Sequence, residues 1–398
     1  MHLLHLIYTL NPDTGGLVTA LYSLVEELEE QGVQNTIACL DDPREAFLKE
    51  APIRVQAMGP GFRSYGYTRK WAKGLSKILP EVDVAVIHGL WQYHGVGSLG
   101  PLKKSSTPFY MFPHGMLDPR IKKLYPSKHQ KKRLYFHFFE RRLFQQARGI
   151  FFTAQMELDS ADEAFPVPKQ NGTVVGMGCI PPEKAPSELA EAFLSKHPEL
   201  LDRRVCLFLS RLHPKKAPDL LIQAWRSLSE TWRQQERPVT LALIGPSDPD
   251  YLEQLETLAG DSLSTRPEPG PSGEIRFYPP LSGDLKWGAL AAAELMALPS
   301  HQENFGMVVA EALAMHTPVL ISREVHIFGE VQNHHGGIIV EDTVSGIREG
   351  LTDWASRRNF HDEPARRNAQ NTFQSCFQMD GVAKRLIESL KPSAQPAP

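Results

Sequence analysis

The sequence predicts an α/β protein built from two doubly wound, Rossmann-like domains, and three observations lead to this prediction. A chain of 398 residues suits two domains of about 150–200 residues each better than a single core. Short apolar runs alternate with helix-length segments, which is typical of a parallel sheet covered on both faces. The same alternation starts again after a polar, proline-rich stretch near Gly176. We therefore expect two sheets whose carboxyl ends face a cleft.

The apolar runs locate the expected strands. In the first domain, a buried strand over 3–9 is followed by a turn-rich segment and by a helix with apolar residues at helical spacing. Further strands of this domain are expected at 36–40, 82–87, 109–112 and 150–153. In the second domain, strands are expected at 205–209, 239–244, 275–278, 294–298, 318–321 and 337–340.

The domain boundaries follow from the same pattern. Residues 1–180 are expected to form the first domain and residues 181–375 the second, with a polar connection that extends to about residue 203. A helix over 376–391 is expected at the end, and a return of this helix to the first domain is an open alternative. The tail 392–398 is too poor in apolar side chains to pack, so we expect disorder there.

Composition narrows the class of protein. A formal net charge of −3 argues against a surface that coats nucleic acid. The four cysteines lack the spacing of a zinc site or of a disulfide framework. No signal-peptide pattern opens the chain, and no apolar run approaches the roughly 18 residues that span a bilayer. These features predict a cytoplasmic protein, with peripheral attachment to the inner face of the membrane as an open alternative.

Two carboxylates stand out in the second domain. A strand ends at Leu298 and a helix begins near Phe305, where free backbone N–H groups favour an anionic or hydroxyl-rich ligand. Glu303 lies in the loop between them, and Glu311 lies eight residues further, on the helix. This spacing predicts two carboxylates on one side of a cleft, able to hold a ribose and a hexose. Taken alone, it also fits a capping acid and a solvated glutamate.

A basic loop follows the expected strand 205–209. Arg211 and Lys216 lie in this loop. Arginine forks onto phosphate oxygens and lysine acts as a mobile point charge, a combination that suits a diphosphate leaving group. A solvated basic loop is the alternative. Gly245, after the next strand, indicates by itself only a turn.

The order of these segments resembles glycosyltransferase family 4, the retaining group 1 glycosyltransferases of the GT-B fold. The matching residues run from Arg211, Lys216 and Gly245 through Pro299, Ser300, Glu303, Asn304, Phe305, Gly306, Glu311 and Ala312 to Thr317, Pro318 and Val319. The resemblance implies that Arg211 and Lys216 bind the donor diphosphate. It also implies that Glu303 lies beside the donor sugar, that Glu311 binds the ribose and that Gly245, Asn304, Phe305, Gly306 and Met307 complete the donor site. Ala217 and His316 depart from the family by replacing glycine.

The resemblance implies an enzyme, a hexosyltransferase. Residues 181–375 would bind a nucleotide-diphosphate sugar, and residues 1–180 a glycan or lipid-linked acceptor, as in polysaccharide or lipopolysaccharide biosynthesis. We expect no cofactor and no metal, because Arg211 and Lys216 can neutralise the leaving group and the nucleotide-sugar is itself a substrate. Sugar phosphorylases and nucleotide-sugar epimerases share this architecture. A non-catalytic nucleotide-sugar-binding protein is the alternative from a different class.

The first domain supplies weaker candidates. Gly16 follows the first strand without a GxGxxG pattern, so a dinucleotide-dependent oxidoreductase is poorly supported; the resemblance implies a glycine loop that approaches the donor phosphates. It also implies that His114, after the strand 109–112, positions the transferred sugar as a catalytic-site residue. Trp91 and Tyr93 could stack on an acceptor sugar. An ordinary turn at Gly16 and structural histidines remain the alternatives.

The segment 120–148 is strongly basic. It holds ten Lys or Arg residues and a single acid, Glu140, interleaved with aromatic and leucine side chains. Such a segment suits an anionic membrane surface or a lipid-diphosphate acceptor. A packed helix with a solvated basic face is the alternative. No nucleic-acid-binding module accompanies the charge, so we expect no nucleic-acid partner.

Overall fold

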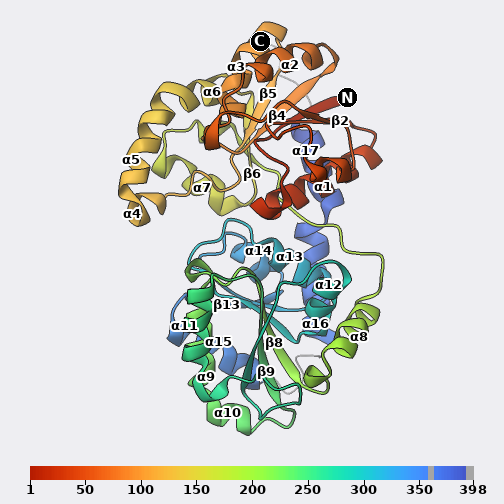
Figure 1. Ribbon diagram of the computed structural model, residues 1–398, viewed down its shortest axis with the longest axis vertical. Coiled ribbons are helices and arrows are strands. Elements are labelled where there is room, and N and C mark those ends of the chain that lie inside the picture. Colours follow the sequence, from red (N-terminus) through yellow and green to blue (C-terminus); the bar gives the residue numbers. More distant parts are fainter. Residues whose placement is uncertain (357–362, 391–398) are drawn as a thin grey trace. The chain divides into compact units, whose positions relative to one another are not determined.

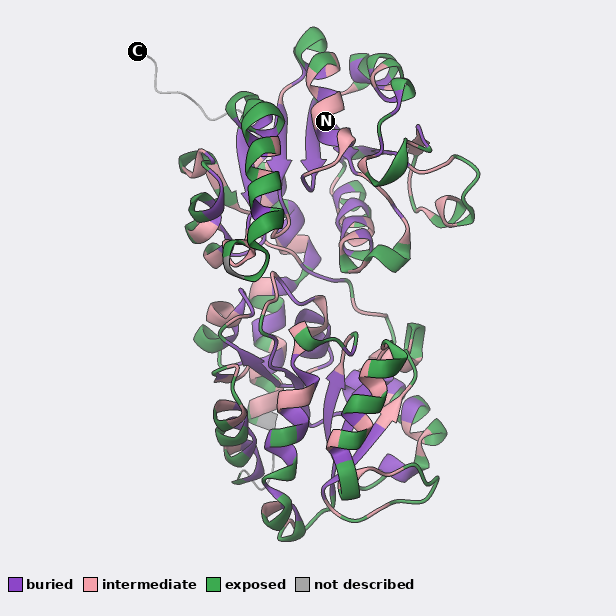
Figure 2. Cartoon of the chain, turned by 60° about the vertical axis from the view of Figure 1, so that its left-hand side comes forward, coloured by how far each residue is buried: buried purple, intermediate pink, exposed green. Residues whose placement is uncertain are grey.

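The protein divides into two compact units in a computed structural model that describes residues 1–356 and 363–390. The first unit comprises Met1–Cys179 together with the chain from Met379, and the second comprises Ile180–Gln378 (Figure 1). In both units most strand residues are buried and most helices expose one face to solvent (Figure 2). The predicted tail 392–398 lies outside the described residues.

The first unit contains a seven-stranded parallel sheet in the order β3-β2-β1-β4-β5-β6-β7. Its strands are β1 His2–Leu6, β2 Gln34–Cys39, β3 Val55–Ala57, β4 Val84–His88, β5 Phe109–Phe112, β6 Gly149–Phe152 and β7 Gly172–Val174. Its helices are α1 Gly16–Glu30, α2 Arg69–Ile78, α3 Tyr93–Ser105, α4 Ile121–Leu124, α5 Pro126–Tyr135, α6 Arg141–Gln146, α7 Gln155–Ala164 and α17 Met379–Leu390.

The C-terminal helix α17 packs on the sheet of the first unit, beside α1 (Figure 1). Val382, Leu386 and Leu390 of this helix join one buried cluster with apolar side chains of β1, β4 and α1. The Arg385 guanidinium donates a hydrogen bond to the carbonyl of Val175, at 2.9 Å. The apolar side chains of α17 are therefore an integral part of this unit's core. Their burial stabilises the folded state, since each Å² of apolar surface removed from water contributes about 25 cal/mol.

The second unit contains a six-stranded parallel sheet in the order β10-β9-β8-β11-β12-β13. Its strands are β8 Arg204–Leu209, β9 Val239–Ile244, β10 Glu274–Tyr278, β11 Leu295–Leu298, β12 Val319–Ser322 and β13 Gly337–Val340. Its helices are α8 Pro186–Lys196, α9 Pro218–Arg226, α10 Ser229–Arg233, α11 Pro249–Ala259, α12 Gly283–Ala292, α13 Met307–Ala314, α14 Phe328–Asn333, α15 Val344–Ser356 and α16 Glu363–Thr372.

Two doubly wound parallel sheets confirm the predicted fold class, with corrections in detail. The first strand ends at Leu6, and the short strands β3 and β7 were not expected. The expectation of a polar connection up to about residue 203 is wrong, because α8 lies within that stretch. This helix buries Leu189 and Phe193. It packs closely on α12, where a Cβ at Gly288 would lie 2.3 Å from the Leu189 carbonyl oxygen.

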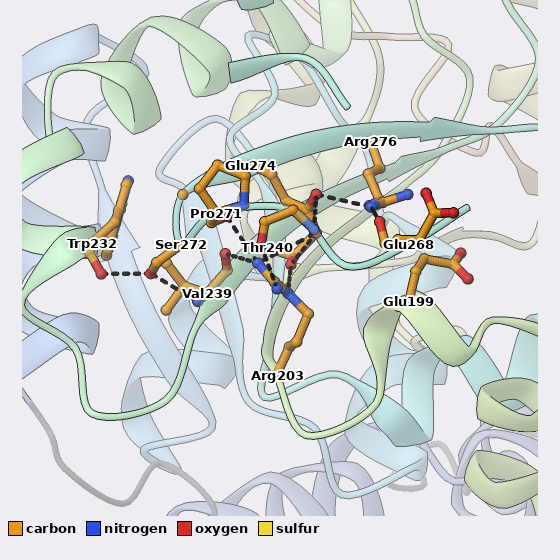
Figure 3. Close-up of polar contacts among 12 residues, drawn as sticks. Glu199, Arg203, Trp232, Val239, Thr240, Glu268, Pro271, Ser272, Glu274 and Arg276 are labelled. Atoms are coloured by element: carbon orange, nitrogen blue, oxygen red, sulfur yellow. Dashed lines mark hydrogen bonds and ion pairs between the residues drawn. The ribbon is translucent and has the colours of Figure 1, made fainter. Parts of the chain in front are cut away.

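A buried ionic network holds the amino-terminal edge of the second sheet (Figure 3). Arg203, just before β8, pairs with Glu274 at 3.3 Å and donates to the Thr240 hydroxyl. Arg276 pairs with the other oxygen of the same carboxylate at 2.9 Å. The two guanidinium groups share one carboxylate and also donate to backbone carbonyls, Arg203 to that of Gly270 and Arg276 to that of Arg266. This edge therefore has a structural role, and the opposite edge is the one where ligands of parallel sheets bind.

Candidate active site

The strand order of the second sheet reverses between β8 and β11, and the loops after these two strands carry the predicted donor residues. Ligands of doubly wound sheets bind at such a switch point, beyond the carboxyl ends of the strands. Arg211 lies exposed in the loop after β8, and Lys216 ends a short 3-10 helix, Pro214–Lys216, in the same loop. Glu303 lies in the loop after β11. The structure therefore brings the two predicted segments to one place.

Backbone hydrogen bonds join these loops. The His301 N–H donates to the carbonyl of Lys215 at 2.9 Å, which ties the loop after β11 to the loop after β8. On its other side, the Glu303 N–H donates to the carbonyl of Glu324 at 3.1 Å, and the Glu303 carbonyl accepts from the N–H of His326 at 3.1 Å. Glu303 is thus held by main-chain contacts on a rigid sheet edge, as a binding residue requires.

The Glu303 carboxylate forms an ion pair with the Lys216 ammonium. Burial, together with the neighbouring cations Arg211 and Lys215, lowers the pKa of Lys216 to about 8. The carboxylate opposes this shift, because an adjacent negative charge favours the protonated amine. Lys216 is therefore a cation at neutral pH whose charge is incompletely solvated, and an incoming phosphate would be a favourable partner for it.

The second predicted carboxylate, Glu311, has a different lysine partner. It is 5% exposed on α13, and its Oε1 lies 2.7 Å from Nζ of Lys286 on α12. Sequence reasoning missed Lys286, because nothing in the sequence indicates which helix α13 faces. The helix begins at Met307 after Gly306, whose φ of 77° lies in the left-handed region. Glu311 is thus a buried charge held in place by one cation.

Two departures from the family pattern occur at positions with unusual backbone geometry. Ala217 has φ of 53° and His316 has φ of 60°, both in the left-handed region. That region costs a non-glycine residue about 1–2 kcal/mol. The family usually has glycine at both positions, because glycine adopts a left-handed conformation without this cost. This chain has the same left-handed conformation at a non-glycine residue in both places.

We predict that Gly245→Ala damages the donor site. Gly245 has φ of 153°, and a Cβ there would lie 2.0 Å from the carbonyl oxygen of Ser210, the residue before Arg211. The main chain must move to relieve this clash, so we expect a loss of roughly 1–3 kcal/mol of unfolding free energy and weaker nucleotide binding. Thermal unfolding with and without nucleotide measures both. The control is Gly329→Ala in the same unit, where an added Cβ meets nothing within 4 Å; equal behaviour of the two variants would contradict the prediction.

The strand order of the first sheet reverses between β1 and β4, next to the predicted glycine loop. Gly15 caps α1 with φ of 122° and ψ of −172°, a conformation that is essentially restricted to glycine. Gly16 is the first residue of α1. The conformational requirement therefore falls on Gly15, whereas the resemblance pointed to Gly16.

His114 follows β5 in a strained turn that Glu157 stabilises. Its φ is 52°, and that of Gly115 is 78°. The buried Glu157 carboxylate accepts from the Gly115 N–H at 2.5 Å and from the Thr153 N–H at 2.9 Å. His114 Nε2 lies 2.9 Å from Nδ1 of His88, at the end of β4. Glu157 is a second residue that sequence reasoning missed, since it lies on α7, beyond the next strand β6.

The two aromatic candidates of the first unit pack against other protein side chains. Trp91 contacts the Phe165 ring with centroids 4.9 Å apart, and Lys132 Nζ lies 4.4 Å from its ring centroid. The backbone N–H of Trp91 donates to Oε1 of Glu140 at 2.8 Å, and burial raises the pKa of that carboxyl to about 7. Tyr93 meets two tyrosine rings edge-on. Both candidates remain half-buried, and their contact with an acceptor stays a prediction.

The basic segment folds into several short helices. These are α4, α5, a π-helical turn Phe136–Glu140 and α6 (Figure 1). One side is buried and includes Glu140, the acid of this segment. The exposed apolar side chains, at 45–63% exposure, are Leu124, Tyr125, Leu134, Phe138 and Phe139. The segment thus combines a packed side with an exposed side that is both basic and apolar.

Within 1–356 and 363–390, no group of three or more His, Cys, Asp or Glu side chains is arranged to hold a metal ion. In the same residues, no helix has the length and apolar character needed to cross a membrane.

Comparisons with known proteins agree with this geometry. Residues 189–372 match the family model "Glycosyl transferases group 1", and residues 15–178 match "Glycosyl transferase 4-like domain". The crystal structure of Alr3699/HepE of Anabaena in complex with UDP has a TM-score of 0.72 at 18% identity, covering 98% of this chain and 99% of that one. WaaG, a glycosyltransferase involved in lipopolysaccharide biosynthesis, has a TM-score of 0.65 at 16% identity, covering 99% and 100%.

A curated relative is similar over a shorter stretch. The D-inositol 3-phosphate glycosyltransferase of a Nocardioides species is 33% identical over 142 residues, which is 35% of this chain and 31% of that protein. The chain thus spans about a third of the length of this relative. Two doubly wound units with charged residues at the switch point define a protein of the GT-B fold class. The chain belongs to the group 1, family 4-like glycosyltransferases.

Proposed function

We propose that this protein transfers a hexose from a nucleotide-diphosphate sugar to a glycan or glycolipid acceptor, with retention of anomeric configuration and without a metal ion. The observation that carries the proposal is the joined pair of loops after β8 and β11, which holds Arg211, Lys216 and Glu303 at the switch point of the second sheet. Such a site is typical of nucleotide-diphosphate binding.

The charges at this site suit a diphosphate leaving group. As the bond between sugar and phosphate stretches, negative charge grows on the diphosphate and positive charge on the anomeric carbon. Lys216 and Arg211 would stabilise the leaving group, while the Glu303 carboxylate, already beside Lys216, would lie next to the donor sugar. Glu311, held by Lys286, would accept hydrogen bonds from the ribose. Because two cations are available, a divalent metal is not required for charge neutralisation.

The donor and pathway are suggested by similar proteins. HepE of Anabaena was solved with UDP and glucose, which favours a UDP-hexose as the first donor to try. WaaG acts in lipopolysaccharide biosynthesis, so assembly of an envelope or exopolysaccharide glycan is the corresponding proposal here. For such an assembly step, the corresponding proposal is a cytoplasmic location at the inner face of a membrane.

The experiment that tests the function measures release of nucleoside diphosphate from UDP-, GDP- and ADP-hexoses with glycan and glycolipid acceptors. It is run in EDTA and in Mg²⁺, and the anomeric configuration of the product is read by NMR. We expect equal rates in both buffers and retention. A rate that requires Mg²⁺ contradicts metal independence, and an inverted product contradicts retention. Release of sugar phosphate that depends on inorganic phosphate would indicate a phosphorylase, and binding without turnover a non-catalytic protein.

The exposed side of the basic segment supports docking on an anionic membrane. Exposed apolar side chains such as Leu134 and Phe138 lie among lysines and arginines, and each basic residue near an anionic surface contributes about 1 kcal/mol. We predict that the protein sediments with phosphatidylglycerol vesicles at low salt and that Leu134→Ser with Phe138→Ser weakens this binding. The control is Phe62→Ser, which changes a side chain that is 65% exposed outside this segment. Equal binding by both variants would argue for a solvated basic face.

A further inference from the structure

A continuous series of polar side chains runs from β2 to the turn after β5 in the first sheet. Asn35, His5 and His88 are buried, and the series ends on His114, which is half-buried. Asn35 of β2 contacts His5 of β1, with 3.2 Å between Oδ1 and Nε2. Nδ1 of His5 lies 3.0 Å from Nε2 of His88 on β4, and Nδ1 of His88 lies 2.9 Å from Nε2 of His114. Because β2, β1, β4 and β5 are neighbours in the sheet, each contact joins one strand, or the turn that follows it, to the next.

The first member of the series fixes the direction of every hydrogen bond. The Asn35 side-chain amide nitrogen donates to the Val33 carbonyl at 2.8 Å. A carbonyl can only accept, so the atom of Asn35 that faces His5 is the oxygen, also an acceptor. His5 must therefore carry its proton on Nε2. Such an assignment follows from the hydrogen-bond network, which is the way tautomers are identified in structures.

Neutral histidines transmit this direction along the series. Burial lowers the pKa of His5 to about 4, that of His88 well below its usual value and that of His114 to about 3. Each ring then holds one proton at neutral pH, and its other nitrogen is an acceptor. Nδ1 of His5 accepts from Nε2 of His88, and Nδ1 of His88 accepts from Nε2 of His114. Nδ1 of His114 is left without a proton.

That last nitrogen is a buried hydrogen-bond acceptor. Among the residues that the structure describes, no side chain or backbone group donates to Nδ1 of His114. His88 and His114 also line a small cavity whose other walls are mostly apolar side chains of α1 and α17, including Leu21 and Val382. A buried acceptor without a donor costs about 1–3 kcal/mol, which a ligand hydroxyl would recover.

We propose that Asn35, His5 and His88 are positioning residues that hold His114 in the tautomer with a bare Nδ1, so that His114 accepts a hydrogen bond from a hydroxyl group of a sugar substrate. This inference rests on the proposed function for the identity of the sugar, but the fixed tautomer belongs to the free protein. It implies that His114 cannot donate a proton to the substrate from Nδ1. A sugar with hydrogen or fluorine in place of that hydroxyl would lose the contact.

The tautomer is tested on the full-length protein without any substrate. Long-range ¹H–¹⁵N NMR of ¹⁵N-histidine protein, assigned with His114→Gln, distinguishes protonated from bare ring nitrogens. We expect His114 to carry its proton on Nε2 in the wild type, where the Asn35 oxygen accepts from Nε2 of His5. Asn35→Leu removes that oxygen, and a mixture of both tautomers is expected at His114. A proton on Nδ1 in the wild type, or an unchanged single tautomer in Asn35→Leu, would overturn the proposal.

Kinetics separate this proposal from the proposed function. With an active donor and acceptor, Asn35→Leu is expected to lower kcat/KM roughly five- to tenfold, the effect of one hydrogen bond between uncharged groups. The loss should vanish when the substrate lacks the hydroxyl. If wild-type protein turns over no donor, the proposed function fails while the NMR result still stands. If wild-type turnover is normal and Asn35→Leu changes neither the tautomer of His114 nor the rate, then Asn35, His5 and His88 have no role in positioning His114.

Discussion

Lys216→Met is expected to reduce kcat/KM by about 10²–10³-fold, the usual effect of removing one preorganised charge from the transition state. Lys216 is the cation that the structure places against Glu303, in the loop after β8. Methionine keeps most of the side-chain volume and removes the charge. The wild-type rate should also fall as the pH rises above about 8, because Lys216, whose pKa is lowered to about 8, loses its proton. That decline should be absent in the variant.

The matched control for this prediction is Lys215→Met. Lys215 is the preceding residue and carries the same charge, and its backbone carbonyl, which accepts from His301, is unaffected by the substitution. Steady-state kinetics of both variants against donor concentration are compared with thermal unfolding. Turnover near the wild-type rate in Lys216→Met, or equal losses in both variants, would show that a general positive charge is sufficient and that Lys216 has no specific role.

Glu311→Gln is expected to lower donor affinity about 10- to 100-fold, because hydrogen bonds to a charged group contribute about 1.5–3 kcal/mol. The amide keeps the shape of the side chain but loses the charge and one acceptor. It also leaves Lys286, at 2.7 Å, without its counter-ion, so the folded state should lose stability as well. Affinity is measured by isothermal titration with nucleoside diphosphate and with the intact donor.

Lys286→Met separates these two effects. It breaks the same ion pair from the other side while the Glu311 carboxylate remains. We expect both variants to unfold at lower temperature but only Glu311→Gln to lose the donor. Similar affinity losses in the two variants would mean that Glu311 acts through the packing of α12 on α13 and that the resemblance assigned it the wrong role.

The sequence predicts features of this protein that depend on local patterns. The buried strands β8 and β11 contain continuous apolar runs in the sequence. The basic residues directly follow the first of these strands, and the glutamates follow the second. Their meeting at the switch point follows from the rule that parallel strands share a carboxyl edge. The strand β3 was missed because its three residues are all half-buried, so they form no continuous apolar run.

Contacts between residues far apart in the sequence could not be predicted from it. Lys286 is recognised only from its ion pair with Glu311 across α12 and α13. Glu157 is recognised only from its hydrogen bond to the turn after β5. Neither residue belongs to a local sequence motif. The same holds for Asn35, His5 and His88, which come from three strands and meet only in the folded sheet. The backbone strain at Ala217 and His316 is likewise evident only from the main-chain torsion angles of the folded protein, although the absence of glycine at both positions is visible in the sequence.

The second unit is proposed to bind a nucleotide-diphosphate sugar through Glu311 and its neighbours. Ligand-observed NMR with UDP-, GDP- and ADP-sugars, without added metal, tests this proposal most directly when wild type is compared with Glu311→Gln. We expect the wild type to bind one nucleotide class selectively and the variant to lose this binding. Absence of binding across the whole panel, or identical binding by the two proteins, would contradict the proposal.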